Sequence, residues 1–112
     1  MLWASVNVIF KEKNKMIIYV DIDNTIFDTE GMDYSGAKPI PERIKKINDL
    51  YDEGNEIVYW TARGTGSGKD WSEVTKNQFK EFGVKYTSLK FGKPVYNLFI
   101  DDKNINSEEF FK

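Results

Sequence analysis

The sequence predicts an α/β domain, in which a small parallel sheet lies between helices in a three-layer Rossmann-like fold. An almost continuous apolar run at residues 16–20 is typical of a strand buried in a parallel sheet. A second run of this kind, residues 57–60, follows an amphipathic helical pattern, as in a strand–helix–strand unit. The length of 112 residues fits one domain.

The remaining elements follow in order along the chain. The helix between the two strands has Pro41 in its first turn, Ile44, Ile47 and Tyr51 on its inner face, and Gly54 as a stop signal. A glycine-rich stretch, residues 63–69, precedes a helix that we expect Asp70 to cap and Gly83 to end. Further strands are predicted at residues 84–87 and 96–100, and one or two helical turns at 106–112.

Residues 1–15 are expected to be an N-terminal extension or an extra edge strand, and residues 16–112 the catalytic domain. The apolar part of that extension is too short to span a bilayer. An exposed edge strand there would leave homo-oligomer formation open.

The composition excludes several chemistries. The chain has no Cys and no His, so it has no Cys/His zinc site, thiolate nucleophile or Ser-His-Asp triad. Its 16 basic and 18 acidic residues give a net charge of −2, with both signs interspersed. This balance argues against a nucleic-acid or membrane partner, and a cytoplasmic location is expected.

Acidic residues follow two of the predicted strands. Asp21 and Asp23 come after the first strand, Thr61 after the second, and Asp101 and Asp102 after the fourth. Because the carboxyl ends of parallel strands meet at one edge, we expect these groups to converge. Crowded carboxylates repel one another unless a cation holds them, and Mg²⁺ is the natural occupant.

These residues resemble the motifs of the haloacid dehalogenase (HAD) superfamily of phosphatases. Residues 21–25, Asp-Ile-Asp-Asn-Thr, look like its DxDxT motif, Thr61 like its second motif, Lys93 like its third, and Asp101-Asp102 like its fourth. The resemblance is closest to small members without a cap domain that act in capsular and lipopolysaccharide sugar biosynthesis. It implies a HAD-like fold, Mg²⁺, and a phosphate monoester substrate such as a sugar phosphate of polysaccharide biosynthesis.

The resemblance also implies roles for the residues. Asp21 would be the nucleophile that forms an aspartyl-phosphate, and Asp23 the general acid and base. Thr61, through its hydroxyl and backbone N–H, and Lys93 would bind the phosphate, and Arg63 would contact the substrate. The Mg²⁺ ligands would be Asp21, the backbone carbonyl of Asp23, Asp101 and, as an open alternative, Asp102.

The resemblance also raises a backbone requirement. Asp23 can serve beside Asp21 only if the chain bends after Ile22, and we expect Asn24 to supply a left-handed residue there. Lys90 is the alternative to Lys93 as the site lysine.

Two other classes of function remain open. A phospho-receiver signalling domain uses similar residues, although in a different order along the chain. A HAD-like protein that binds a phosphosugar or a partner without turnover is the other. The glycine-rich stretch fits neither nucleotide-binding glycine motif.

Overall fold

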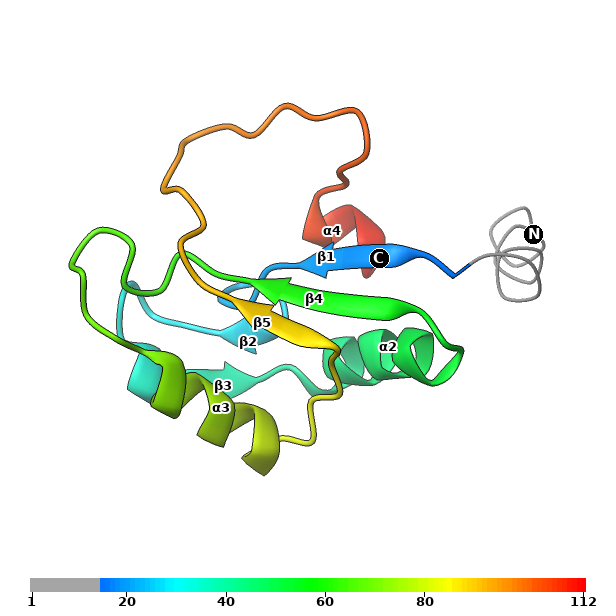
Figure 1. The fold of residues 1–112 in the computed structure, drawn as a ribbon, viewed down its shortest axis with the longest axis horizontal. Helices are drawn as coiled ribbons and strands as arrows, with labels where there is room; N and C mark the ends of the chain where they lie inside the picture. The colour runs from blue at the N-terminus through cyan, green and yellow to red at the C-terminus, as the bar shows by residue number, and fades with distance from the viewer. Residues whose placement is uncertain (1–14) are drawn as a thin grey trace.

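A parallel sheet of three strands lies at the centre of the structure, a computed structural model that describes residues 15–112. The strands are β1 (Ile17–Val20), β4 (Glu56–Trp60) and β5 (Ser88–Lys90), in the order β1-β4-β5 (Figure 1). Ile18 lies opposite Ile57, and Val58 lies opposite Ser88. The predicted α/β domain with a small parallel sheet is therefore confirmed. Of the predicted extension at residues 1–15, residues 1–14 lie outside the described residues.

The helix α2 (Pro41–Asp52) joins β1 to β4 and has the predicted ends. Proline occupies its first turn, and Gly54, with φ +98°, follows its C-terminus. Its inner face buries Ile44, Ile47 and Leu50. Leu50 takes the core position that we predicted for Tyr51, which is exposed.

The helix α3 (Ser72–Glu81) begins one residue later than predicted. Its N-cap residue is Trp71, so the prediction of Asp70 as the cap was wrong. The Asp70 carboxylate instead accepts hydrogen bonds from the backbone N–H of Ser72, at 2.9 Å, and from its hydroxyl, at 2.6 Å. These hydrogen bonds lower the pKa of Asp70 and fix the entry of the chain into α3.

The segment between β1 and α2 forms a small flap. It contains the antiparallel pair β2 (Phe27–Asp28) and β3 (Lys38–Pro39), with the 3₁₀ helix η1 (Tyr34–Gly36) between them. Ile22, Ile26 and Phe27 are fully buried, so the start of the flap is part of the core. The ring of Phe27 meets that of Phe79 edge to face, with the ring centres 6.0 Å apart.

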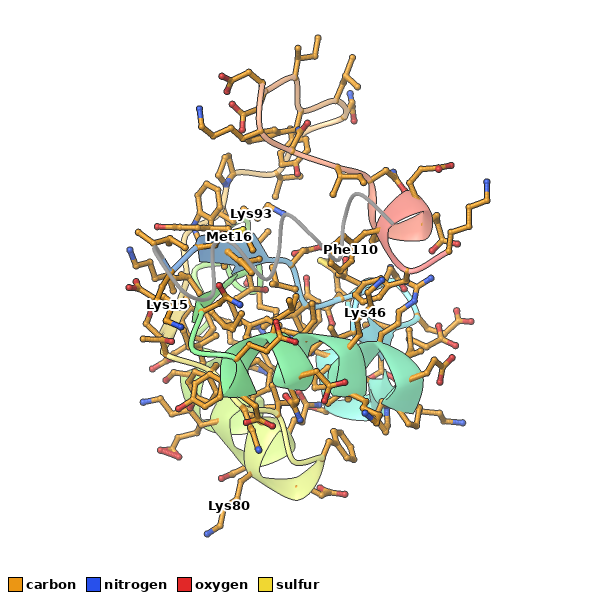
Figure 2. All side chains as sticks on the ribbon, turned by 90° about the vertical axis from the view of Figure 1, so that its right-hand side faces the viewer. Lys15, Met16, Lys46, Lys80, Lys93 and Phe110 are labelled. Carbon is orange, nitrogen blue, oxygen red and sulfur yellow. The ribbon has the colours of Figure 1, made fainter. Side chains whose placement is uncertain are left out.

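The C-terminal helix α4 (Ser107–Phe110) packs back onto α2. The Lys46 ammonium on α2 donates to the backbone carbonyl of Phe110 at 2.8 Å and lies 4.5 Å from the centre of its ring (Figure 2). Arg43, also on α2, pairs with Glu108 at 2.7 Å. The end of the chain is therefore fixed to the body of the domain. Within residues 15–112, no helix combines the length and apolar composition that a membrane span requires.

The two later strands differ from the predictions. The third strand lies at Ser88–Lys90 instead of residues 84–87, because Val84 packs into the core and pairing with β4 begins only where the Thr87 N–H meets the Ile57 carbonyl. Residues 96–100 form no strand. They belong to the long segment, residues 91–106, that arches away from the sheet in Figure 1, and Leu98 and Ile100 are 74% and 87% exposed.

The first strand is also less buried than predicted. Ile17 and Tyr19 are 65% and 52% exposed, whereas Val20 is buried. Among residues 15–112, β1 pairs only with β4, so its other edge has no strand beside it. An apolar run is buried on both faces of a sheet only where other elements cover both faces, and the exposure of Ile17 and Tyr19 shows that one face of β1 is not covered by the described residues.

Candidate functional site

The turn after β1 sets the positions of Asp21 and Asp23. The Ile22 carbonyl accepts hydrogen bonds from three consecutive backbone N–H groups, those of residues 25–27. Asn24 has φ 61°, the left-handed conformation that Asn adopts more readily than most residues. The predicted bend after Ile22, with Asn24 as its left-handed residue, is confirmed.

Asp21 combines solvent access with a neighbouring cation. Its Oδ1 lies 3.3 Å from the Lys93 Nζ, and its Oδ2 accepts a long hydrogen bond of 3.4 Å from the Thr25 hydroxyl. The Asp21 side chain is 38% exposed, whereas that of Lys93 is 14% exposed. A small anionic ligand can therefore meet both the carboxylate and the ammonium at this edge of the sheet.

Backbone contacts hold Lys93 beside β4. Its N–H donates to the Thr61 carbonyl at 3.1 Å, and its own carbonyl accepts from the Thr65 hydroxyl at 2.8 Å. Lys90, the alternative that the sequence left open, instead lies 3.3 Å from the Tyr19 hydroxyl and is exposed. Of these two lysines, Lys93 is the one that the structure places against Asp21.

Asp23 is held from two sides. Arg63 donates to both of its oxygens, from Nε at 2.9 Å and from Nη2 at 2.8 Å. The Thr29 hydroxyl donates to the same carboxylate at 2.7 Å. The Asp23 side chain is 17% exposed, and these hydrogen bonds hold its carboxylate in a fixed orientation.

Arg63 lies inside the protein, which differs from the predicted substrate contact. Its side chain is 0% exposed, and its Nη1 donates to the Thr75 hydroxyl at 2.9 Å and to Gln78 Oε1 at 2.7 Å. The guanidinium carbon lies 5.0 Å from the Tyr34 ring centre and 5.8 Å from that of Phe27. The guanidinium therefore links Asp23 to α3 and to the flap and does not reach solvent.

Tyr34 lies beside the ion pair of Asp23 and Arg63. Burial raises the pKa of its hydroxyl, the nearby Asp23 carboxylate raises it further, and Arg63 opposes both effects. The Gln78 amide donates to the Tyr34 backbone carbonyl at 2.7 Å, so η1 is attached to α3 next to this charged pair.

Thr61 is placed differently from the prediction. It is 1% exposed, its N–H donates to the Lys90 carbonyl at 3.0 Å, and its hydroxyl accepts from the Arg63 backbone N–H at 3.1 Å. The N–H that was predicted to bind phosphate therefore completes the sheet. In this structure Thr61 contacts the site only indirectly, by accepting hydrogen bonds from the backbone N–H groups of Lys93 and Arg63.

The predicted Mg²⁺ ligands do not come together. Asp101 and Asp102 are exposed in the segment 91–106, and Asp102 pairs with its neighbour Lys103 at 3.2 Å. Within the described part of the chain, no three acidic side chains lie close enough to hold a metal ion. The arrangement of residues 15–112 therefore does not fit the predicted Mg²⁺ site.

Sequence reasoning missed the residues that hold Arg63 and Asp23, namely Thr29, Thr75 and Gln78. The available signal was on α3, where Thr75 and Gln78 share the buried face with Phe79. Polar side chains on the inner face of a helix need buried partners. That pattern could have pointed to an internal charged group.

Comparisons with known proteins leave the family open. No family model matches the chain, and no curated protein matches it. A crystal structure of a protein from Vibrio cholerae, an MCSG target, is similar in fold, with a TM-score of 0.76. The two chains are 25% identical, and the match covers 86% of this chain and 87% of the other. The name of that protein states no activity, so the similarity supports the α/β fold alone.

Proposed function

We propose that this chain is a phosphomonoester hydrolase of the haloacid dehalogenase type that works through an aspartyl-phosphate on Asp21. The observation that carries the proposal is the contact of 3.3 Å between Lys93 Nζ and Asp21 Oδ1, at the end of β1, with the carboxylate 38% exposed. An accessible carboxylate is a nucleophile that needs no helper base, and the adjacent cation attracts a phosphate group.

The reaction takes place in two displacements at phosphorus. In the first, one Asp21 oxygen attacks phosphorus, the bond from phosphorus to the ester oxygen breaks, and the alcohol leaves with a proton from Asp23. In the second, water attacks phosphorus, the bond to Asp21 breaks, and a proton from the water passes to Asp23. The products are the alcohol and inorganic phosphate, and Lys93 balances the charge on the phosphoryl oxygens throughout.

The contacts of Asp23 limit how it can transfer a proton. Both of its oxygens accept hydrogen bonds from Arg63, and one also accepts from Thr29. Asp23 must carry a proton before it can act as the acid, and it can hold that proton only on an oxygen whose hydrogen bond from Arg63 or Thr29 has opened. Arg63 and Thr61 thus act by positioning Asp23 and Lys93, in place of the direct substrate contacts that the sequence suggested.

A requirement for Mg²⁺ is part of the proposal, although no step above depends on it. The carboxylates of Asp21, Asp101 and Asp102 would approach one another only if the segment 91–106 moved toward the end of β1. The ion would contribute positive charge near the phosphate. The resemblance to polysaccharide-biosynthesis phosphatases makes a sugar phosphate the expected substrate, and cytoplasmic location and homo-oligomer formation stay predictions.

The proposal is tested by phosphate release from p-nitrophenyl phosphate and from a panel of sugar phosphates, with Mg²⁺ or with EDTA. We expect Asp21→Asn to abolish turnover, because an amide cannot form the aspartyl-phosphate. Asp49→Asn is the matched control, since Asp49 is an exposed residue on α2 that pairs with Lys45. We expect this control to keep full activity.

Two results would contradict the proposal. Equal phosphate release by the Asp21→Asn and unsubstituted proteins would exclude Asp21 as the nucleophile. A long-lived phosphoprotein formed from acetyl phosphate, without turnover of any ester, would favour the receiver domain instead. Loss of activity in EDTA that Mg²⁺ restores would support the metal requirement.

A further inference from the structure

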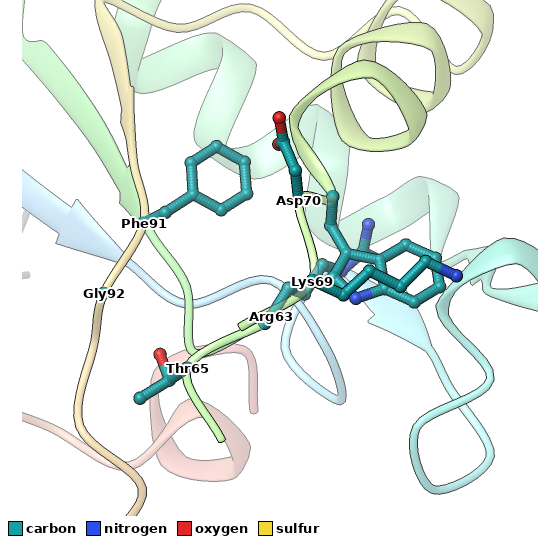
Figure 3. Close-up of a pocket in the computed structure, with 8 residues that line it drawn as sticks. Arg63, Thr65, Lys69, Asp70, Phe91 and Gly92 are labelled. Carbon is teal, nitrogen blue, oxygen red and sulfur yellow. The ribbon is translucent and has the colours of Figure 1, made fainter. Parts of the chain in front are cut away.

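A cavity of about 150 Å³ lies between the glycine-rich loop after β4 and the start of the segment after β5. Figure 3 shows the Phe91 ring extending from one of these segments toward the other, which carries Asp70 and Arg63. The side chains and backbone that form its walls include Thr65, Lys69, Asp70, Trp71, Phe91 and Gly92. Arg63 and Gly64 complete the walls, and of all the lining residues only Arg63, which holds Asp23, has a role in the proposed chemistry.

This cavity adjoins the candidate site through two direct connections. Gly92 in its wall precedes Lys93, the residue whose ammonium meets Asp21. Thr65, also in the wall, donates its hydroxyl to the Lys93 carbonyl at 2.8 Å. The cavity therefore borders the backbone that positions Lys93.

The glycine-rich loop forms one wall of the cavity and has a defined backbone conformation. The Gly68 N–H donates to the Gly64 carbonyl at 2.8 Å, which closes the loop on itself. Gly64 has φ +82°, and a side chain at this position would collide with the Lys69 carbonyl oxygen. Only glycine fits there, so the close approach of the two sides of the loop depends on Gly64.

The walls combine aromatic surface with polar groups. The Lys69 ammonium lies 4.3 Å from the Trp71 ring centre, and the Tyr34 ring meets Trp71 edge to face at 5.0 Å, so Trp71 is held in place. Phe91 adds a second ring. Thr65, Lys69 and Asp70 supply a hydroxyl, an ammonium and a carboxylate. Rings bind the flat faces of a ligand, and these groups hydrogen-bond its hydroxyls.

The cavity is open to solvent, so its volume indicates the part of a ligand that it can hold. A cavity of about 150 Å³ holds one six-membered ring, as the binding of benzene in an engineered cavity of that volume illustrates. A nucleoside, with a base and a ribose, is larger than one ring. The mixture of aromatic and polar walls favours a ring that carries hydroxyl groups over a plain hydrocarbon ring.

We propose that this cavity is the subsite for the leaving alcohol, where Phe91 and Trp71 hold the hydroxylated six-membered ring of a monosaccharide phosphate. The assignment rests on the proposed phosphatase function and adds the residues that would determine its specificity. The subsite contacts the part of the substrate that does not react, so it contributes binding that is the same before and during the reaction.

The kinetic test compares Phe91→Ala with Phe99→Ala on two substrates, glucose 6-phosphate and glycerol 1-phosphate, which has no ring. We expect Phe91→Ala to raise KM for glucose 6-phosphate about tenfold or more with little change in kcat. Its KM for glycerol 1-phosphate should not change. Phe99→Ala removes a half-exposed ring outside the cavity and should change neither constant. Equal KM increases on both substrates, or none, would overturn the assignment.

A binding test separates this proposal from the proposed function. The indole N–H of Trp71 is followed by NMR in the Asp21→Asn variant while glucose, which has no phosphate, is added. We expect a saturable shift of this signal, and its loss in Phe91→Ala. If turnover is absent but the shift occurs, the subsite stands and the phosphatase proposal fails. If turnover is normal and no shift occurs, the phosphatase proposal stands and the subsite is overturned.

Discussion

Replacement of Arg63 by Met removes the buried cation that joins Asp23, α3 and the flap. Met has similar length and no charge, so the change deletes four hydrogen bonds with little change in volume. Thr75 keeps a second bond, from its hydroxyl to the Trp71 carbonyl, but Gln78 Oε1 loses its partner while buried. Asp23 keeps only Thr29.

The expected loss of stability follows from these contacts. Breaking a buried ion pair by removing one partner costs about 3–5 kcal/mol, and a buried acceptor without a partner costs about 1–3 kcal/mol. Because Asp23 is 17% exposed and partly hydrated, we expect the total near the lower figure, about 3–4 kcal/mol. Domains of this size have a free energy of unfolding of about 5–15 kcal/mol, so Arg63→Met should remain folded but be clearly weakened.

Urea denaturation followed by circular dichroism measures this loss, provided that the m-value stays constant. The double variant Arg63→Met/Asp23→Asn should lose less than the sum of the two single losses, by about 1–3 kcal/mol, because the charge left behind is gone. Lys85→Met is the control, since Lys85 and Asp52 form an ion pair that is half exposed on both sides, and it should change stability little. A loss below about 1 kcal/mol for Arg63→Met, or additive losses in the cycle, would refute the buried role of Arg63.

Three further predictions concern the core and the turn after β1. Phe79→Ala should lower the free energy of unfolding, measured in urea, by about 3–5 kcal/mol, because Phe79 is 1% exposed and packs on three aromatic rings. A loss below about 1 kcal/mol would contradict this packing. Asn24→Ala should cost about 1–2 kcal/mol through backbone strain, because φ is 61° at this position, in addition to the lost hydrogen bond from the Thr29 N–H to Asn24 Oδ1. Asn24→Gly loses the same hydrogen bond without the strain and should cost less, and the reverse order would disprove backbone strain as the cause. Burial raises the pKa of Tyr59 above its ordinary value of 10.0, so the unfolded chain loses this proton first and stability should fall as pH rises above about 10. Tyr59→Phe should make the free energy of unfolding, measured from pH 8 to 11, fall less steeply with pH. An unchanged dependence on pH would show that other groups cause the fall.

Local patterns were sufficient for part of the fold and of the site. Pro41 and Gly54 marked the ends of α2 because each fits a terminal backbone geometry whatever surrounds it. The bend at Asn24 followed from the requirement that Asp21 and Asp23 serve one site. Lys93 was predicted as the site lysine with Lys90 as its alternative, and the structure places Lys93 at Asp21.

Long-range contacts were not predictable in the same way. Arg63 meets partners 40, 12 and 15 residues away, and no local pattern distinguishes an internal arginine from a loop arginine. Residues 96–100 have the composition of a strand, yet an apolar run forms a strand only where a neighbouring strand and a covering layer are available. The third strand was displaced for a related reason, since its pairing with β4 sets where it begins.

The attachment of α4 has an entropic consequence for the segment 91–106. Lys93 is fixed to Thr61 at one end of this segment, and Lys46 and Arg43 fix α4 at the other. The segment is therefore a loop whose two ends are both attached to the domain, and Asp101 can reach only the positions that the length of this loop allows. The approach of Asp101 to Asp21 that the proposed Mg²⁺ site requires would take place at an effective concentration set by this loop, which does not depend on protein concentration. Release of α4 from α2 would lower that effective concentration and leave Asp21 and Lys93 in place.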